Sequence, residues 1–178
     1  MRKMASETIV LGGGCFWCTE AVFELFKGVV KTAVGYSGGT KENPTYEEVC
    51  SGATGHIEVL KLDYDPKVMP LDLVFQVFFA MHDPTSMDRQ GADFGEQYRS
   101  VIFYTTDAQK KAAEAFIKKA QSDYKKPIVT ELRKLDKFYE AEDYHQKYFD
   151  NNPHAGYCSI VIGPKVAKIK REFSSLLK

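Results

Sequence analysis

Two cysteines separated by two aromatic residues are the side chains of this chain best suited to chemistry. Cys15 follows three consecutive glycines, and Cys18 comes after Phe16 and Trp17. Only a few per cent of an ordinary thiol is ionised at neutral pH, and the partial positive charge at the start of a helix favours the thiolate. Because the pattern predicts a helix that begins near Cys15, we expect a lowered pKa and a nucleophilic sulfur there.

Phe16 and Trp17 place two large rings beside that thiol. Ionisation of a cysteine does not need them, so they indicate that something apolar lies next to the sulfur. On a helix the same two side chains are equally compatible with the protein core. The residue pattern by itself leaves both interpretations open.

Glu58 is the second candidate, because it lies on the apolar face of a predicted strand. In residues 56–64 the side chain of Glu58 alternates in step with Leu60 and Leu62. Desolvation raises the pKa of a carboxyl group, which makes a buried glutamate a possible proton donor near neutral pH. A thiol, an acid and an aromatic wall together suit attack on a sulfoxide sulfur, whose oxygen must be hydrogen-bonded or protonated. The wall would hold the methyl group of methionine sulfoxide.

Short strands and helices alternate around these residues. The patterns predict strands over 8–11, 29–34, 56–64, 101–104 and 128–132, and helices over 15–28, 45–50, 70–81, 107–122, 140–150 and 166–176. Thr45 and Glu48 have the spacing of a capping box. The glycines of 35–39 predict a turn, 82–98 a long functional loop, and 151–164 an irregular stretch carrying Cys158.

This order of elements is compatible with a βαββαβ core, in which helices pack on one face of a mostly antiparallel sheet. We therefore expect an α+β two-layer sandwich with a mostly antiparallel or mixed sheet, a ferredoxin-like core and an irregular C-terminal segment. The length of 178 residues, without repeats or linkers, predicts a single catalytic domain over 1–178.

The charge balance and cysteine usage exclude several classes of protein. Lys plus Arg and Asp plus Glu number 24 each, which argues against nucleic acid as a partner. No apolar run is long enough to cross a bilayer and residues 1–6 have no signal-peptide core, so we expect a cytoplasmic protein. Four cysteines then indicate redox or metal chemistry. Zinc is disfavoured because the single C-x-x-C has no second ligand pair, and we expect no metal or other cofactor.

A series of segments, occurring in one order from residue 8 to residue 163, resembles peptide methionine sulfoxide reductase A. The most specific are 14–17, 35–39, 43–52, 55–58, 82–84, 88–91 with Asp93, 97–100 and 152–158. The resemblance implies reduction of methionine S-sulfoxide, free or in proteins, in repair after oxidative damage. It also implies recycling by thioredoxin or another dithiol, and we expect a monomer.

Carried to this sequence, the resemblance implies that Cys15 attacks the sulfoxide sulfur while Glu58 gives a proton to its oxygen. Cys15 would be left as a sulfenic acid, which condenses with a second thiol to a disulfide. The substrate-binding positions that it implies are Phe16 and Trp17 for the methyl group, Tyr46 and Tyr98 for the oxygen, and Asp93 for orientation.

The thiol that resolves the sulfenic acid stays open between two cysteines. Cys158 matches the family's resolving cysteine, but Cys18 stands where many relatives have a non-cysteine residue, often glycine. Residues three apart on a helix lie on neighbouring faces, so a disulfide between Cys15 and Cys18 is an alternative. The C-terminal helix lacks the further recycling cysteine of some relatives, and Cys50 is expected to be an inert buried thiol.

Two other functions remain as alternatives. A thioredoxin-like dithiol oxidoreductase is motivated by the C-x-x-C at a helix start, and it requires Cys18 but not Glu58. A zinc-bound interaction module requires stoichiometric metal in the purified protein.

Overall fold

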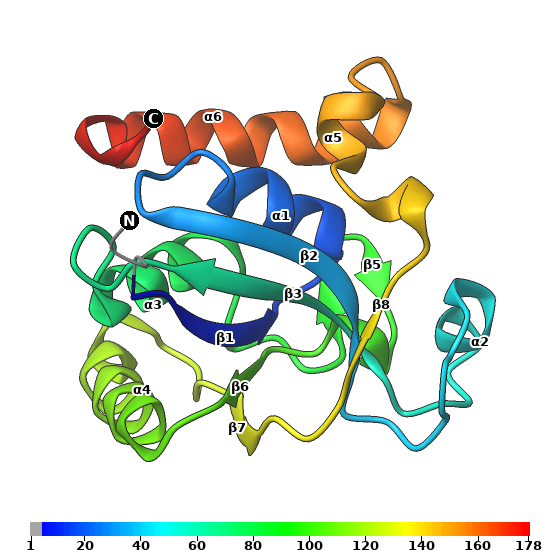
Figure 1. The fold of residues 1–178 in the computed structure, drawn as a ribbon, viewed down its shortest axis with the longest axis horizontal. Coiled ribbons are helices and arrows are strands. Elements are labelled where there is room, and N and C mark those ends of the chain that lie inside the picture. Colours follow the sequence, from blue (N-terminus) through cyan, green and yellow to red (C-terminus); the bar gives the residue numbers. More distant parts are fainter. Residues whose placement is uncertain (1–4) are drawn as a thin grey trace.

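The computed structural model describes residues 5–178 and contains a curled six-stranded sheet with helices packed mainly against one face (Figure 1). The strand order is β7-β6-β1-β3-β2-β8, in which β6 and β7 are parallel and the other neighbours antiparallel. The strands are β1 (Glu7–Gly12), β2 (Val29–Ser37), β3 (Ile57–Tyr64), β6 (Val101–Tyr104), β7 (Glu131–Lys134) and β8 (Phe138–Glu140).

The helices and the small elements complete this arrangement. The α-helices are α1 (Phe16–Phe23), α2 (Tyr46–Cys50), α3 (Leu71–Met81), α4 (Asp107–Ala120), α5 (Tyr148–Asn151) and α6 (Gly163–Glu172). The predicted loop 82–98 contains a two-stranded ribbon of β4 (Arg89–Gln90) and β5 (Asp93–Phe94), followed by a 3-10 turn, η1 (Glu96–Tyr98). Most of the segment 1–6, for which we expect no targeting signal, lies outside the described residues. Within 5–178, no helix has both the length and the apolar content needed to cross a bilayer.

The main core lies between the sheet and the helices α1, α3 and α6. Leu60 and Leu62 of β3 belong to this core, whereas Val59 belongs to a smaller cluster on the opposite face of the sheet. Because side chains alternate along a strand, Glu58 points to the same side as Leu60. The predicted face of Glu58 is therefore confirmed, and it brings the carboxyl group under α1.

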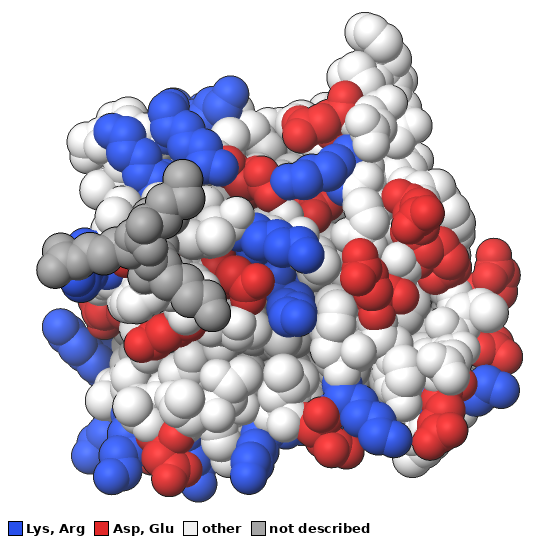
Figure 2. Space-filling model, viewed as in Figure 1, with Lys and Arg blue, Asp and Glu red and all other residues white. Residues whose placement is uncertain are grey.

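The space-filling view shows charged residues of both signs on the surface (Figure 2). On the face that it shows, basic side chains gather over the C-terminal end of α6, and acidic side chains lie toward α2 and β8. No basic stripe of the kind that follows a phosphate backbone crosses this face.

The glycine segment 35–39 differs from the prediction. Strand β2 continues through Ser37, and the turn starts only at Gly38, whose φ is +91°. Gly35 is inside the strand because β8 approaches closely: a Cβ atom there would lie 2.3 Å from the carbonyl oxygen of Tyr139. A close backbone contact, and not a turn, explains this glycine.

The predicted helix over 140–150 is wrong. The segment contains the end of β8, a 3-10 turn η3 (Asp143–His145) and the one-turn helix α5. Gln146 interrupts any longer helix, because its side-chain amide accepts a hydrogen bond from Val34 N at 3.0 Å and donates one to Val34 O at 3.0 Å. These bonds satisfy the edge of β2 and override local helix propensity.

The predicted irregular C-terminal segment is also wrong beyond residue 155. Cys158 begins a π-helical turn, η4 (Cys158–Ile162), which leads directly into α6. Pro164 suggested a boundary because it has no backbone N–H for a helical bond. The widened turn ahead of it, together with its place in the first turn of α6, allows the chain to continue as a helix.

Candidate active site

Cys15 is the N-cap residue of α1 and follows the end of β1 after Gly13 and Gly14. Gly14 turns the chain between them with a φ of +94°, a conformation that favours glycine. The carbonyl oxygen of Cys15 accepts the first helical bonds, from Cys18 N at 3.1 Å and Thr19 N at 3.4 Å. Its thiol lies at the sheet end of the helix and is only 7 % exposed.

Glu58 lies beside the start of α1 with its carboxyl group almost wholly buried, at 1 % exposure. One carboxyl oxygen, Oε1, accepts a hydrogen bond from Phe16 N at 3.2 Å. Within the described residues the other oxygen, Oε2, has no partner. Burial raises the pKa of Glu58 to about 8. Near neutral pH the group is therefore mostly a carboxylic acid and able to donate a proton.

The pKa of the Cys15 thiol is raised, so the predicted lowering is wrong. Burial is the main cause, followed by a hydrogen bond to Cys18 and by the negative charge of Glu58. The same hydrogen bond from Cys15 lowers the pKa of Cys18. A protonated Glu58 no longer repels a thiolate, so the acid form of the carboxyl group also favours ionisation of Cys15.

Tyr46 on α2 and Tyr98 on η1 both lie near enough to Glu58 for its charge to act on their phenols. Burial raises the pKa of each phenol, and the charge of Glu58 raises it further. Both side chains therefore keep their O–H donors at neutral pH. The structure brings these two predicted residues together with Glu58, and the charge of Cys15 also acts on Tyr98.

Asp93 is connected to the thiols by Tyr157, a residue to which the sequence analysis assigned no role. Its carboxylate, at the start of β5, accepts a hydrogen bond from the Tyr157 hydroxyl at 2.6 Å. The same hydroxyl lies 4.0 Å from the sulfur of Cys18. The available signal for Tyr157 was its position next to Cys158, which the predicted irregular segment obscured.

Aromatic rings enclose the other side of the thiol. Phe16 is buried, with its ring centroid 5.7 Å from that of Tyr36 and 6.5 Å from that of Tyr46. Trp17 is partly exposed and stacks on Tyr148, with centroids 3.7 Å apart and planes inclined by 7°. The hollow of about 10 Å³ that Trp17 borders is lined by Glu20 and Lys147, and not by Cys15 or Glu58. The two predicted aromatic residues directly follow the thiol in α1.

His145 holds the edge of the indole and was not predicted. The Trp17 indole N–H donates to His145 Nδ1 at 3.0 Å, and the imidazole is fully buried at 0 % exposure. Since Nδ1 accepts this bond, the neutral ring carries its proton on Nε2, which has no partner within the described residues. His145 is a lone histidine in a polar segment, so the sequence offered no signal for this contact.

Replacing His145 with phenylalanine is expected to shift the indole N–H resonance of Trp17 toward that of a free indole. The variant keeps an aromatic ring but removes the acceptor, and an unsatisfied N–H costs about 1–2 kcal/mol of folding stability. Trp17 is the only tryptophan of the chain, so NMR and denaturant unfolding report on this bond directly. The exposed His154, changed to phenylalanine, is the matched control. An unmoved indole resonance would contradict the bond.

The two remaining cysteines differ in burial. Cys158 is fully buried at 0 % exposure on η4, which packs against α1, and its pKa is raised by burial and by the charge of Cys18. Cys50 is exposed, so its predicted burial is wrong. In the short helix α2 the buried apolar position is Val49, and Cys50 at the helix end faces solvent beside Tyr46.

These features define a class: an α+β protein with a buried pair of thiols at a helix start, facing a carboxylic acid, as in a thiol-dependent oxidoreductase. The family model "Peptide methionine sulfoxide reductase" matches residues 7–176. A protein of Psychrobacter sp. (strain PRwf-1), "Peptide methionine sulfoxide reductase MsrA", is 52 % identical over 96 % of this chain and 98 % of its own length. The chain belongs to the peptide methionine sulfoxide reductase family.

Solved structures agree with this assignment. Reduced Mxr1 from Saccharomyces cerevisiae superimposes with a TM-score of 0.82 at 37 % identity, covering 86 % of this chain and 89 % of that one. Mxr1 in complex with Trx2 gives a TM-score of 0.59 at 28 % identity, covering 80 % and 84 %. The mixed α+β fold with its curled sheet is therefore that of the family.

Proposed function

We propose that this enzyme reduces the S epimer of methionine sulfoxide, free or in peptides and proteins, with Cys15 as nucleophile and Glu58 as general acid. The observation that carries the proposal is the buried carboxyl group at the start of α1. One of its oxygens is fixed by Phe16 N, and the other is free to face a substrate oxygen beside Cys15. Such a reaction repairs methionine side chains after oxidative damage.

In the first step the Cys15 thiolate attacks the sulfoxide sulfur while Glu58 transfers its proton to the sulfoxide oxygen. The oxygen passes to Cys15, methionine leaves, and Cys15 becomes a sulfenic acid. One thiol and one sulfoxide thus give one sulfenic acid and one thioether, with two electrons transferred from Cys15. The hydroxyl groups of Tyr46 and Tyr98 donate hydrogen bonds to the same oxygen, where negative charge develops.

The substrate side of the site is supplied by the aromatic residues and by Asp93. Phe16 and Trp17 bound the apolar region next to Cys15, where the methyl group of the substrate binds. Asp93, held by Tyr157, orients the substrate backbone from the opposite side. The polar groups face the oxygen and the apolar groups face the methyl, which matches the two ends of a sulfoxide.

Cys18 resolves the sulfenic acid first, because the two thiols lie one helical turn apart at the start of α1 and each shifts the pKa of the other. Attack of Cys18 on the sulfenic sulfur releases water and forms a Cys15–Cys18 disulfide. Cys158 is next in the relay, since it can exchange with the Cys18 sulfur from η4. An external dithiol then restores the two thiols, and the Mxr1–Trx2 complex supports thioredoxin in this role. No other cofactor takes part in the cycle.

Turnover of a peptide that carries methionine sulfoxide tests the proposed function. Oxygen loss of 16 Da is followed by mass spectrometry, with dithiothreitol as reductant. The wild-type enzyme is expected to reduce the S epimer only, and Cys15→Ser to be inert. Cys50→Ser, at an exposed cysteine, is the matched control and should keep activity. Retained turnover in Cys15→Ser would contradict the proposed mechanism, in which Cys15 is the nucleophile.

The purified wild-type protein and its variants also distinguish the proposed function from the two alternative functions. A thioredoxin-like dithiol oxidoreductase would keep its disulfide exchange activity in Glu58→Gln, whereas the sulfoxide reductase loses its turnover. A metal-bound module would carry stoichiometric zinc, which elemental analysis measures. Among residues 5–178, no three His, Cys, Asp or Glu side chains gather as metal ligands would.

We also propose that residues 1–178 form one catalytic domain with a ferredoxin-like core, and that it acts as a monomer in the cytoplasm. The strand order β6-β1-β3-β2, with α1 and α3 as the connecting helices, supports the ferredoxin-like description. Thiols that must be reduced again after each cycle suit a reducing compartment. Light scattering and cell fractionation test these points.

A further inference from the structure

We propose that a cavity beside the catalytic site is a subsite for an anionic side chain next to methionine sulfoxide in a peptide, with Lys165 as its cationic partner. This inference rests on the proposed function, because it concerns the sequence context in which the sulfoxide is reduced. It assigns a preference for glutamate or aspartate in the residue that neighbours the methionine sulfoxide.

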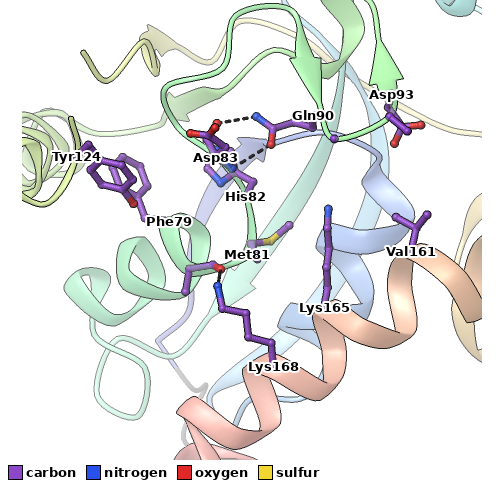
Figure 3. Close-up of a pocket in the computed structure, with 13 residues that line it drawn as sticks. Phe79, Met81, His82, Asp83, Gln90, Asp93, Tyr124, Val161, Lys165 and Lys168 are labelled. Atoms are coloured by element: carbon purple, nitrogen blue, oxygen red, sulfur yellow. Dashed lines mark hydrogen bonds between the residues drawn. The ribbon is translucent and has the colours of Figure 1, made fainter. Parts of the chain in front are cut away.

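The cavity has a volume of about 540 Å³ and lies between the end of α3, the β4–β5 ribbon and α6 (Figure 3). Its apolar lining comes from segments far apart in the sequence: Phe79 and Met81 of α3, Tyr124 after α4, and Val161 of η4. This is ample room for one acidic side chain, whose methylene groups would contact the apolar wall.

The cavity adjoins the site of chemistry at Asp93. This residue lines the cavity and accepts the hydrogen bond of Tyr157, whose hydroxyl lies 4.0 Å from the Cys18 sulfur. Neighbouring residues of an extended peptide are about 3.3–3.6 Å apart along the chain. A peptide with its sulfoxide at Cys15 and its backbone at Asp93 therefore places an adjacent side chain at the mouth of the cavity.

Lys165 supplies an uncompensated positive charge in that cavity. Its partly buried side chain rises from α6 toward Gln90 and Asp93 (Figure 3). Within residues 5–178, no hydrogen bond or ion pair engages its ammonium group, whereas that of Lys168 donates to the carbonyl of Ala80 at 2.9 Å. A partly buried cation with no counter-ion gains a charge-assisted bond when an anion binds.

Neither acidic residue that lines the cavity forms an ion pair with Lys165. The carboxylate of Asp83 is occupied by the backbone N–H and hydroxyl of Thr85, at 2.9 Å and 2.6 Å. Asp93 is occupied by Tyr157. The pKa of Cys18 is lowered mainly by the hydrogen bond from Cys15, and the positive charge of Lys165 lowers it further. An incoming carboxylate thus meets a lysine ammonium that has no partner within residues 5–178, while Asp83 and Asp93 keep their own negative charges at the cavity wall.

The test compares two short blocked peptides that differ only in Glu or Gln next to methionine sulfoxide. We expect kcat/KM to favour the Glu peptide by about fivefold in the wild-type enzyme, the effect of a partly exposed ion pair of about 1 kcal/mol. Lys165→Met should bring the ratio of the two peptides to about one, and Lys165→Glu should invert it. The ratio cancels any effect of the substitutions on the thiols.

Lys168→Met is the matched control, because it removes a lysine of the same helix and cavity whose ammonium is already engaged. The Glu-to-Gln ratio should be unchanged in this variant and should fall with added salt in the wild-type enzyme. If the Glu-to-Gln ratio of kcat/KM is the same in the wild type and in both Lys165 variants, and turnover is intact, the proposed subsite is wrong. An equal loss of the ratio in Lys168→Met would also contradict the subsite. Failure of the wild-type enzyme to reduce either peptide would contradict the proposed function instead.

Discussion

Glu58→Gln is expected to lower kcat/KM for methionine sulfoxide by about 10²-fold or more, the usual contribution of a general acid. Glutamine keeps the shape and one hydrogen-bonding oxygen but cannot give a proton to the sulfoxide. Because the pKa of the Cys15 thiol is also raised, the thiolate fraction of both proteins still increases over this pH range. The ratio of wild-type to variant kcat/KM should therefore fall as the pH rises through about 8, because Glu58 loses its proton there. Steady-state rates between pH 6 and 10 measure both effects.

The same substitution should stabilise the fold at neutral and alkaline pH. The pKa of Glu58 is raised in the folded state to about 8, above the value of about 4.3 in an unfolded chain. Folding therefore takes up a proton, so the stabilisation is complete below the unfolded pKa and is lost as the pH rises through the folded pKa. Glutamine has no such loss. The gain in free energy of unfolding of the variant over the wild type should be larger at pH 8 than at pH 5, by about 3–4 kcal/mol.

Denaturant unfolding of both proteins at the two pH values measures this difference. Glu42→Gln, at an exposed glutamate with a surface ion pair to Lys137, is the matched control and should change neither rate nor stability appreciably. An unchanged pH profile in Glu58→Gln would mean that another group is the acid. A loss of rate together with a loss of stability would indicate structural damage and not the loss of a proton donor.

The position of Glu58 could be derived from the sequence because it depends on a local rule. Alternation along β3 placed its carboxyl group with Leu60 and Leu62, and those residues belong to the main core. The same kind of local signal located the capping box of α2, whose Thr45 side chain accepts from Glu48 N. Where a residue's surroundings come from its own element, the pattern is sufficient.

The pKa of Cys15 could not be derived in this way. The helix start alone predicts a lowered value, but burial and the bond to Cys18 reverse the direction. Part of this burial comes from residues more than 100 positions away, because η4 packs on α1. The contact of Asp93 with Tyr157 joins segments 64 positions apart for the same reason. Such contacts depend on tertiary packing, which the local sequence does not encode.

Cys18→Ser is expected to release one methionine per enzyme in a single turnover and then to slow steady-state reduction with thioredoxin by about tenfold or more. The chemical step needs only Cys15 and Glu58, so the first product still forms. The Cys15 sulfenic acid then lacks the thiol one helical turn away, and with it the rate advantage of proximity. Trapping with a sulfenic-acid reagent, followed by mass spectrometry, should find this species in Cys18→Ser.

Cys158→Ser provides the comparison, because its sulfur is buried on η4 and its pKa responds to Cys18. This variant should form the Cys15–Cys18 disulfide at the wild-type rate and show no trapped sulfenic acid. The opposite pattern, in which Cys158→Ser accumulates the sulfenic acid and Cys18→Ser cycles normally, would make Cys158 the resolving thiol. Direct capture by Cys18 is the expected route, because Cys15 is the N-cap of α1 and Cys18 lies in the first turn of the same helix.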